Sequence, residues 1–597
     1  MIKQNSAETG FWNTYRTNEW IFLAIIIAIG LLLRWMNLTD RPLHHDESLH
    51  AIYGLYIYDD PQNGFYKYNA LLHGPLLYNI LPFIYDLFGT GKWAVRFLTA
   101  FLGTGFMFAP FIFRKYFHKN TLLFLVTCIA LSPSLVFWSR FLRHDYLAIT
   151  SMLLVLWGIF CVKEKYAFFP IIIGMVLQFT IKENAFVTTS LLLGYVIFES
   201  LFKKIFLKKT RTSIQVIFEK ISESKISFLF ALILAVFIYT LLYSAGFKYA
   251  QGILDGLYRE SLGYWLNQHQ MERIVGPFIY HILVLSWYEL YFIIFSLIHM
   301  VHFYYKAKGP YLYALLSALT IAAILHISIG QNLNQINFLY KVLKIKIPID
   351  FYPFIIIIVH AFNVTIFYLK RNDTKKAFWG YLFFGTLFAY SFVGEKVPWL
   401  ASYPLLTGII FLAIYLEENL ILDNILNLKS WKKIPINGLV LMMIILLFTL
   451  KTSISTNFAR SGSSTELVSQ VHTEKAFENI LFKIKDKMLH PTQENPVSIL
   501  AYNMSWPTSW YFFRLPNYYF ISDGSNLSSY DYVLADPHNP INDPNIYRTH
   551  QKINLAFRSW WVPPYDTLTW SEFFSYLFTH NPTRGVGSSF CDLYIRK

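Results

Sequence analysis

The sequence has few charged residues for its length. Only 15% of its 597 residues are Asp, Glu, Lys or Arg, whereas 55% are hydrophobic and 19% are aromatic. Soluble globular proteins carry about a quarter charged residues. The shortage of charge therefore excludes an ordinary soluble multidomain protein and predicts a polytopic integral membrane protein.

Cysteine is also scarce, and the basic residues form no separate polar module. The chain has three cysteines, and no spacing among them is typical of a zinc site or a disulfide framework. The net charge is +15, but most of the Lys and Arg residues lie in short loops between apolar runs. This pattern excludes a nucleic-acid partner and indicates membrane topology instead.

Long apolar runs recur through the first three quarters of the chain. A bilayer core about 30 Å thick needs roughly 20 helical residues to cross it. On this basis we predict about 13 spans. They lie near residues 20–36, 93–113, 120–138, 146–161, 167–181, 185–201, 226–246, 278–304, 310–329, 352–368, 377–393, 403–416 and 436–451.

The basic loops set the predicted orientation. If the N-terminus is cytoplasmic, the basic loops 203–211 and 370–376 also face the cytoplasm, as the positive-inside rule requires. The same count places six segments outside the cytoplasmic (inner) membrane. They are 37–92, 140–145, 182–183, 247–277, 394–399 and the C-terminal tail.

Two domains are expected. Residues 1–451 would form an all-α transmembrane domain, whose first outer loop, 37–92, contains a short apolar segment, Leu76 to Phe88, that suits an interfacial helix. Residues 452–597 are more polar, and the runs that begin at Pro496 and Tyr532 read as strands. We therefore predict a small extracytoplasmic α/β domain at the C-terminus.

The densest polar cluster follows the first span. It contains three histidines and two adjacent carboxylates, Asp46 and Glu47. A helix that starts near Asp46 would place Asp46 and His50 on one face, with Glu47 turned about 100° away. The carboxylates are open to two interpretations, helix capping or chemistry.

A second cluster, Arg140 to Asp145, lies at the outer end of a predicted span. Arginines there are able to extend to lipid headgroups, but Arg143 beside Asp145 also suits a functional pair, because an ionised group near the bilayer core costs about 3 kcal/mol. Two further pairs fall on the same predicted face, Lys182 with Glu183 and Glu395 with Lys396.

Acidic and basic residues on one membrane face suit glycosyl transfer from a phospholipid-linked sugar. A carboxylate must accept the proton of the acceptor hydroxyl, and Asp46 is our candidate base. Basic side chains would stabilise the charge that grows on the departing phosphate. Because phosphate leaves without protonation, a single displacement with inversion is expected.

Several segments together resemble a known family, the flippase-activity-associated family of the GT-C superfamily. That superfamily also includes protein O-mannosyltransferases and the lipid A aminoarabinose transferase. The segments are 44–51, 72–78, 139–145, 182–183, 260–269 and 394–400, with further pieces at 506–511 and 558–563. The resemblance implies a GT-C-like helical bundle and a membrane glycosyltransferase with a polyprenyl-phosphate-linked donor.

The resemblance also implies roles for individual residues. Asp46, Glu47 and Asp145 would be the catalytic acids. The residues expected to bind the donor phosphate or the substrate are His45, His50, His73, Arg143, Lys182, Glu183, Glu395 and Lys396. The chain departs from the family pattern at Tyr403, where a histidine is expected. Some superfamily members use a divalent metal and others do not, and no ligand spacing here decides between them.

The sequence leaves two other functions open. A transporter or flippase component for lipid-linked sugars would bind the same headgroup without breaking a bond. A scaffold for glycan assembly would act through the C-terminal domain. As partners we expect the lipid-linked sugar, membrane lipid, and an acceptor that is a glycan, a lipid or a protein.

Overall fold

The computed structural model describes residues 17–597 except 115, 163–165, 209–210, 269–275, 332–350, 419–435, 491–496 and 505. The expectations for the N-terminal end, for residues 209–210 of the loop 203–211 and for residues 269–275 of the loop 247–277 therefore lie outside the described residues.

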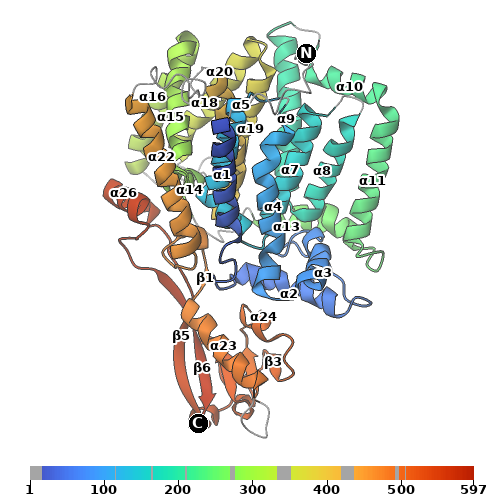
Figure 1. Ribbon diagram of the computed structural model, residues 1–597, viewed down its shortest axis with the longest axis vertical. Coiled ribbons are helices and arrows are strands. Elements are labelled where there is room, and N and C mark those ends of the chain that lie inside the picture. Colours follow the sequence, from blue (N-terminus) through green and yellow to red (C-terminus); the bar gives the residue numbers. More distant parts are fainter. Residues whose placement is uncertain are drawn as a thin grey trace.

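Each of the predicted spans corresponds to a helix or a pair of helices in one bundle (Figure 1). They are α1 (Thr17–Trp35), α4 (Lys92–Ile112), α5 (Lys119–Leu131) with α6 (Pro133–Ser139), α7 (His144–Phe160), α8 (Phe168–Ile181), α9 (Asn184–Ile205), α11 (Lys225–Tyr243), α14 (Tyr280–Tyr288) with α15 (Leu290–Ala307), α16 (Gly309–Gln331), α18 (Phe351–Lys370), α19 (Thr374–Phe392), α20 (Ser402–Glu418) and α22 (Ile436–Ile454).

The bundle is that of an integral membrane protein. Within the described ranges, seven helices are long and apolar enough to cross a membrane, and the bent pair α5–α6 would make eight. Helices α7 and α8 are also apolar but shorter, with 17 and 14 residues. The predicted fold class, a bundle of apolar helices with a small C-terminal α/β domain, is confirmed.

Two segments predicted as continuous spans are interrupted. The chain bends by 59° between α5 and α6, where Pro133 occupies the first turn of α6 and the Ser132 hydroxyl accepts a hydrogen bond from the Leu135 N–H. Proline disfavours helical backbone at the residue before it, so α5 ends at Leu131. The second interruption is Glu289, which separates α14 from α15.

The first outer loop folds as two helices at one end of the bundle. Helix α2 spans His45–Asp59, and α3 spans Leu76–Phe88, as predicted for the interfacial helix. Phe83 and Leu87 of α3 are 72% and 70% exposed, which suits a helix that rests on lipid. Figure 1 shows both helices at the end opposite the start of α1.

The C-terminal domain is built on a six-stranded mixed sheet with the strand order β1-β5-β6-β4-β2-β3. The runs predicted as strands are β2 (Ile499–Tyr502) and β4 (Tyr532–Ala535), which pair in parallel. The other strands are β1 (His472–Thr473), β3 (Tyr518–Ile521), β5 (His550–Trp560) and β6 (Gly587–Arg596). The domain helices include α23 (Lys475–Leu489), α24 (Thr508–Phe512), α25 (Ile546–Thr549) and α26 (Trp570–Thr579).

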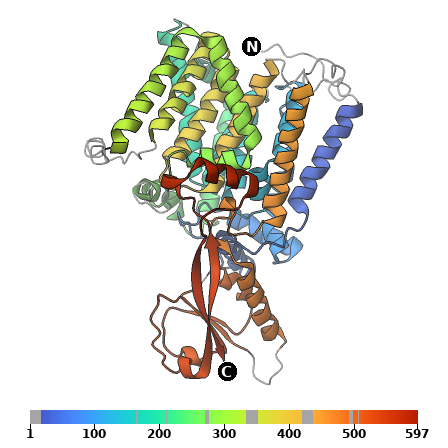
Figure 2. The ribbon, with the colours of Figure 1, turned by 90° about the vertical axis from the view of Figure 1, so that its left-hand side faces the viewer.

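The domain is attached to the bundle end that carries α2 and α3. Figure 2 shows β5 and β6 as a long ribbon that reaches the bundle, where α26 lies across the helices. The Trp287 indole N–H of α14 donates to the Phe573 carbonyl of α26 at 3.2 Å. On the other side, Lys92 at the start of α4 pairs with Glu478 of α23 at 2.9 Å. Helices α26 and α23 of the domain therefore both contact this end of the bundle.

Candidate active site

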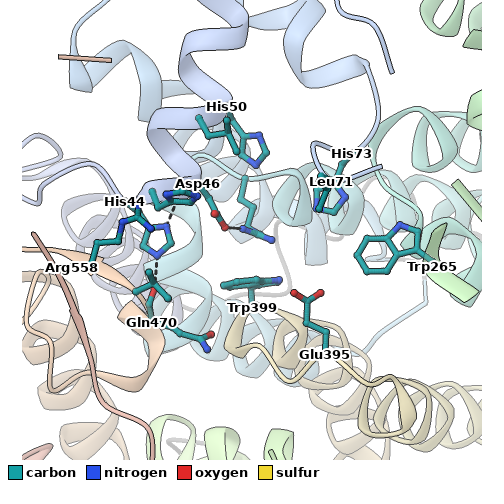
Figure 3. Close-up of a pocket in the computed structure, with 14 residues that line it drawn as sticks. His44, Asp46, His50, Leu71, His73, Trp265, Glu395, Trp399, Gln470 and Arg558 are labelled. Carbon is teal, nitrogen blue, oxygen red and sulfur yellow. Dashed lines mark hydrogen bonds and ion pairs between the residues drawn. The ribbon is translucent and has the colours of Figure 1, made fainter. Parts of the chain in front are cut away.

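A cavity of about 240 Å³ lies where the bundle meets the C-terminal domain (Figure 3). Its walls come from α2, the loop before α3, the start of α7, helix α13 (Ser261–Gln268), the loop after α19 and the C-terminal domain. The lining residues are His44, His45, Asp46, Leu49, His50, Leu71, His73, Arg143, Trp265, Glu395, Trp399, Gln470, Val471 and Arg558. These segments are the ones that the sequence assigned to a single face of the membrane.

His44 fixes the position of Asp46 at the start of α2. Its Nδ1 accepts a hydrogen bond from the Asp46 backbone N–H at 3.1 Å, and its Nε2 bonds to the Gln470 carbonyl of the C-terminal domain. A carbonyl only accepts, so the proton of the neutral ring is on Nε2. Burial lowers the pKa of His44, which agrees with the neutral ring that this cap requires. The C-terminal domain thus helps to hold the helix turn that presents Asp46.

The Asp46 carboxylate opens on the cavity and forms an ion pair with Arg143. Its side chain is 23% exposed, so it remains accessible from the cavity. Burial alone would raise the pKa of the Asp46 carboxyl, but the Arg143 charge and the adjacent histidines lower it below its usual range. Asp46 is therefore held in its ionised form.

Glu47 is engaged behind the cavity. Its carboxylate accepts from Arg96 Nε at 2.8 Å and Nη2 at 2.7 Å, and from the His44 backbone N–H at 3.1 Å, which completes a capping box. Burial would raise the pKa of Glu47, but Arg96 and Arg41 together lower it to about 2. For Glu47 the structure shows the capping interpretation, and its side chain does not line the cavity.

Asp145 and Lys182 hold Arg143 in place from behind. Arg143 Nε donates to Asp145 at 3.0 Å, and Lys182 Nζ lies 2.7 and 2.8 Å from the two Asp145 oxygens. The guanidinium carbon of Arg143 lies 3.6 Å from the centroid of the Trp399 ring. Arg143 is therefore fixed between Asp46 in front and Asp145 behind, with its flat face on an indole.

A second group of side chains is organised around His73. Its Nδ1–H donates to Glu183 at 2.8 Å, and its ring stacks on Trp265 at 6.0 Å between centroids. His50 Nδ1 lies 2.7 Å from the Tyr78 hydroxyl. Both histidines line the cavity, and Glu183 orients one of them without lining it.

The predicted site residues thus fall into three sets. Those that line the cavity are Asp46, His45, His50, His73, Arg143 and Glu395. Those that hold the lining residues from behind are Glu47, Asp145, Lys182 and Glu183. Lys396 belongs to neither set, because its Nζ donates to the backbone carbonyls of Ser391 and Val393.

The sequence did not single out the wall that the C-terminal domain supplies. Gln470, Val471 and Arg558 line the cavity, and none of them was assigned a role. Arg558 lies in one of the segments that carry the family resemblance, which was the available signal. Nothing in the sequence around Gln470 and Val471 indicated that they line the cavity. Trp399 and Trp265 lie in the resembling segments too, and the structure adds their rings to the site.

In the part of the chain that the structure describes, no group of three or more His, Cys, Asp or Glu side chains is placed to hold a metal ion. We therefore assign none of the cavity residues to a metal.

Comparison with known proteins adds distant structural likenesses. No family model matches the sequence, and no curated protein matches it. The chain is similar to ArnT from Cupriavidus metallidurans in the apo state, with 12% identity over 87% of this chain and 93% of that chain and a TM-score of 0.42. ArnT bound to undecaprenyl phosphate gives 12% identity, coverage of 87% and 94%, and a TM-score of 0.36.

The Archaeoglobus fulgidus oligosaccharyltransferase in its apo form gives 11% identity over 88% of this chain and 70% of that chain, with a TM-score of 0.47. At this low identity and low TM-score, membership of the flippase-activity-associated family stays a prediction.

Proposed function

We propose that this chain is a membrane glycosyltransferase that moves a sugar from a polyprenyl-phosphate donor to a hydroxyl group of an acceptor. The observation that carries the proposal is the pair Asp46 and Arg143. A carboxylate able to take a proton and a guanidinium able to bind a phosphate face one cavity at the end of an apolar helical bundle.

The donor phosphate would bind at Arg143. A guanidinium recognises phosphate through two parallel N–H donors, and Arg143 is held rigidly by Asp145 and Trp399. His73 lines the same cavity and is oriented by Glu183. A lipid-linked donor fits this place, because its isoprenoid would lie among apolar helices while its headgroup enters the cavity.

Asp46 would act as the general base. It accepts the proton of the acceptor hydroxyl while the hydroxyl oxygen forms a bond to the anomeric carbon. The bond from that carbon to the phosphate oxygen breaks, and its electron pair leaves with the phosphate. Arg143 stabilises the charge that develops there. No acid is needed for the leaving group, and the anomeric configuration is inverted.

The ion pair between Asp46 and Arg143 couples the two roles. An incoming phosphate competes with Asp46 for the guanidinium. As Arg143 turns its donors to the phosphate, the charge that lowers the pKa of Asp46 is neutralised, and the carboxylate becomes a stronger base. Lys182 keeps Asp145 ionised behind Arg143 throughout this exchange. Binding of the donor would thus prepare the base.

The proposal is tested by transfer of radiolabelled sugar from polyprenyl-phosphate donors by membranes that contain wild type, Asp46→Asn or Asp86→Asn at matched protein levels. Asp86 is an exposed carboxylate of the same outer loop and serves as the control. We expect Asp46→Asn to lower the rate by about 10²–10⁴-fold, as for loss of a general base, and Asp86→Asn to match wild type.

Equal transfer by wild type and Asp46→Asn would contradict the assignment of the base. If wild type moves donor lipid between leaflets but never transfers or hydrolyses its sugar, the transporter interpretation replaces the enzyme.

A further inference from the structure

We propose that the C-terminal domain supplies a second anion-binding subsite in the cavity, in which Arg558 binds a phosphate or carboxylate group carried by the acceptor. That the bound molecule is the acceptor depends on the proposed function. The existence of the subsite depends only on the contacts of Arg558 and its neighbours.

Arg558 lies near the end of β5 and lines the cavity. One of its terminal nitrogens donates to the Trp506 carbonyl at 2.6 Å, and its Nε is buried without a partner. Within the described ranges no carboxylate lies within ion-pair distance of it. Arg558 is half-buried, and withdrawing a cation partly from water without an ion-pair partner is unfavourable, so an anion bound at this guanidinium would stabilise it.

Two buried arginines that have no carboxylate within ion-pair distance differ from Arg558, which is half-buried. Arg34 donates to three backbone carbonyls, and Arg140 donates to four. Neither of them lines the cavity, whereas Arg143, which does line it, is paired with Asp46 and Asp145. Arg558 is therefore the arginine of the cavity that has no carboxylate within ion-pair distance in the described chain, and the charge of Asp46 acts on it only from farther away.

Two neighbours on the same side of the cavity have free hydrogen-bonding atoms. His45 Nδ1 and Gln470 Oε1 are buried without partners in the described structure, and both residues line the cavity. Burial and the Arg558 charge lower the pKa of His45 to about 3, so its ring is neutral and offers hydrogen bonds rather than charge. A cation with two unpartnered polar atoms beside it suits a polar anionic molecule.

The backbone of this wall is also strained. Val471 has a φ of 58°, in the left-handed region, which β-branched residues rarely adopt. Such conformations persist where the surrounding structure imposes them, and they gather at binding sites. Val471 follows Gln470, whose carbonyl bonds to His44, so the strained turn is tied to the helix that presents Asp46.

The position of Arg558 indicates which substrate carries the anion. Figure 3 shows Arg558 and Gln470 on one side of Asp46, and Trp399 and Glu395 on the other. Arg143 comes from the membrane bundle, where a lipid phosphate arrives, whereas Arg558 comes from the domain that projects away from it (Figure 2). An anion at Arg558 therefore belongs to a molecule that enters from the aqueous side. Two anions bound at Arg143 and Arg558 would bracket Asp46 and present the acceptor hydroxyl to it.

The test is equilibrium binding to the purified full-length protein in lipid nanodiscs. The probes are undecaprenyl phosphate for the lipid side, and glucose 1-phosphate, glucuronate and glucose for the aqueous side. We expect wild type that is saturated with undecaprenyl phosphate still to bind glucose 1-phosphate or glucuronate, and to bind glucose more weakly. The preferred anion identifies the acceptor group as phosphate or carboxylate.

Variants assign the two subsites. Arg558→Gln should weaken binding of the soluble anion by about tenfold or more and leave undecaprenyl phosphate unchanged, because a hydrogen-bonded charge is removed. Arg143→Gln should do the reverse. Arg558→Lys keeps the charge and should retain part of the affinity, and thermal unfolding of each variant shows whether it is folded. Arg548→Gln removes an exposed arginine of the same domain and should bind as wild type does.

Four results would overturn the subsite: no binding of either soluble anion by wild type, competition between the soluble anion and undecaprenyl phosphate, unchanged binding by a folded Arg558→Gln, or an equal loss in Arg548→Gln. These readouts need no turnover. Failure of the subsite is therefore separate from failure of the transferase, which the Asp46→Asn assay decides.

Discussion

Single residues in this site carry out several tasks at once. Arg143 pairs with Asp46, is oriented by Asp145 and stacks on Trp399. Glu47 caps α2 and also receives two arginines, Arg96 and Arg41. A buried carboxylate between two guanidinium groups fixes the first turn of α2, and with it the backbone of Asp46. The chemistry of Asp46 thus depends on a neighbour that does not touch the cavity.

Replacing Glu47 tests this dependence. We expect Glu47→Gln to lower the stability of the protein by roughly 3–5 kcal/mol at pH 7, because buried Arg96 loses its counter-charge. The pKa of Glu47 is lowered from 4.5 to about 2 by folding, so its stabilisation is present above pH 4.5 and is lost as the pH falls toward 2. Unfolding in detergent should show a constant advantage of wild type between pH 7 and 5 that shrinks toward pH 3. Equal midpoints at pH 7 would contradict this role.

The sequence predicted the site in part, and the reasons are local. Dense polar clusters beside apolar runs contain Asp46, His50 and Arg143. An ionisable residue in such a place indicates a functional site. The distinction between Asp46 and Glu47 was out of reach, because the partner of Glu47, Arg96, lies in a helix that reads as an ordinary span. Arg558 reaches the cavity through the pairing of β5 and β6, which no local pattern encodes. The ammonium group of Lys396 donates to nearby backbone carbonyls, so its predicted role at the donor phosphate stays a prediction.

Among the elements, the two interrupted helices meet inside the bundle. Glu289 separates α14 from α15, and its Oε1 accepts from the Ser132 hydroxyl and from the Ser134 N–H, both at 2.8 Å. Those donors stand at the break between α5 and α6. Where a helix is interrupted within a membrane, its backbone N–H and C=O groups need other hydrogen-bond partners. The Glu289 carboxylate lies at one interruption and accepts hydrogen bonds from the other. The sequence predicted the positions of the helices well, because apolar length is a strong signal. The interruptions at Pro133 and Glu289 were not predicted, because one proline or one glutamate hardly changes the hydropathy of a long apolar run.

Changing Glu289 should reveal how strongly the two breaks are joined. Glu289→Gln keeps an oxygen that accepts the same two hydrogen bonds, so we expect a modest loss of stability. Glu289→Leu leaves the Ser134 N–H unpaired in the bundle, and we expect a further loss of about 1–3 kcal/mol. The measurement is the unfolding midpoint of each variant in the same detergent. A leucine variant as stable as the glutamine variant would show that the link is dispensable.

At the scale of the whole molecule, the cavity has one wall from each domain. Removing the contacts between the domains should therefore affect catalysis as well as stability. Glu478 of α23 is buried and accepts from Lys92, from Lys475 and from the Tyr511 hydroxyl. This carboxylate anchors the C-terminal domain beside α2.

Loss of Glu478 should loosen the C-terminal domain. We expect Glu478→Ala to be cleaved faster by a protease between residues 460 and 475 and to transfer sugar more slowly, because the wall that holds His44 and carries Arg558 is no longer fixed. Asp486→Ala, on the same helix but exposed, is the control and should behave as wild type. If Glu478→Ala resists the protease and transfers normally, the domain is held by other contacts.

In the proposed mechanism, Asp46 activates an acceptor for one displacement at a lipid-linked sugar. The most direct measurement is the anomeric configuration of the sugar in the product, determined by NMR after transfer by the purified protein from a donor of known configuration. We expect an inverted product, formed by wild type and lost in Asp46→Asn. Retention of configuration would contradict it, because retention requires a covalent intermediate on the enzyme and a different role for the carboxylate.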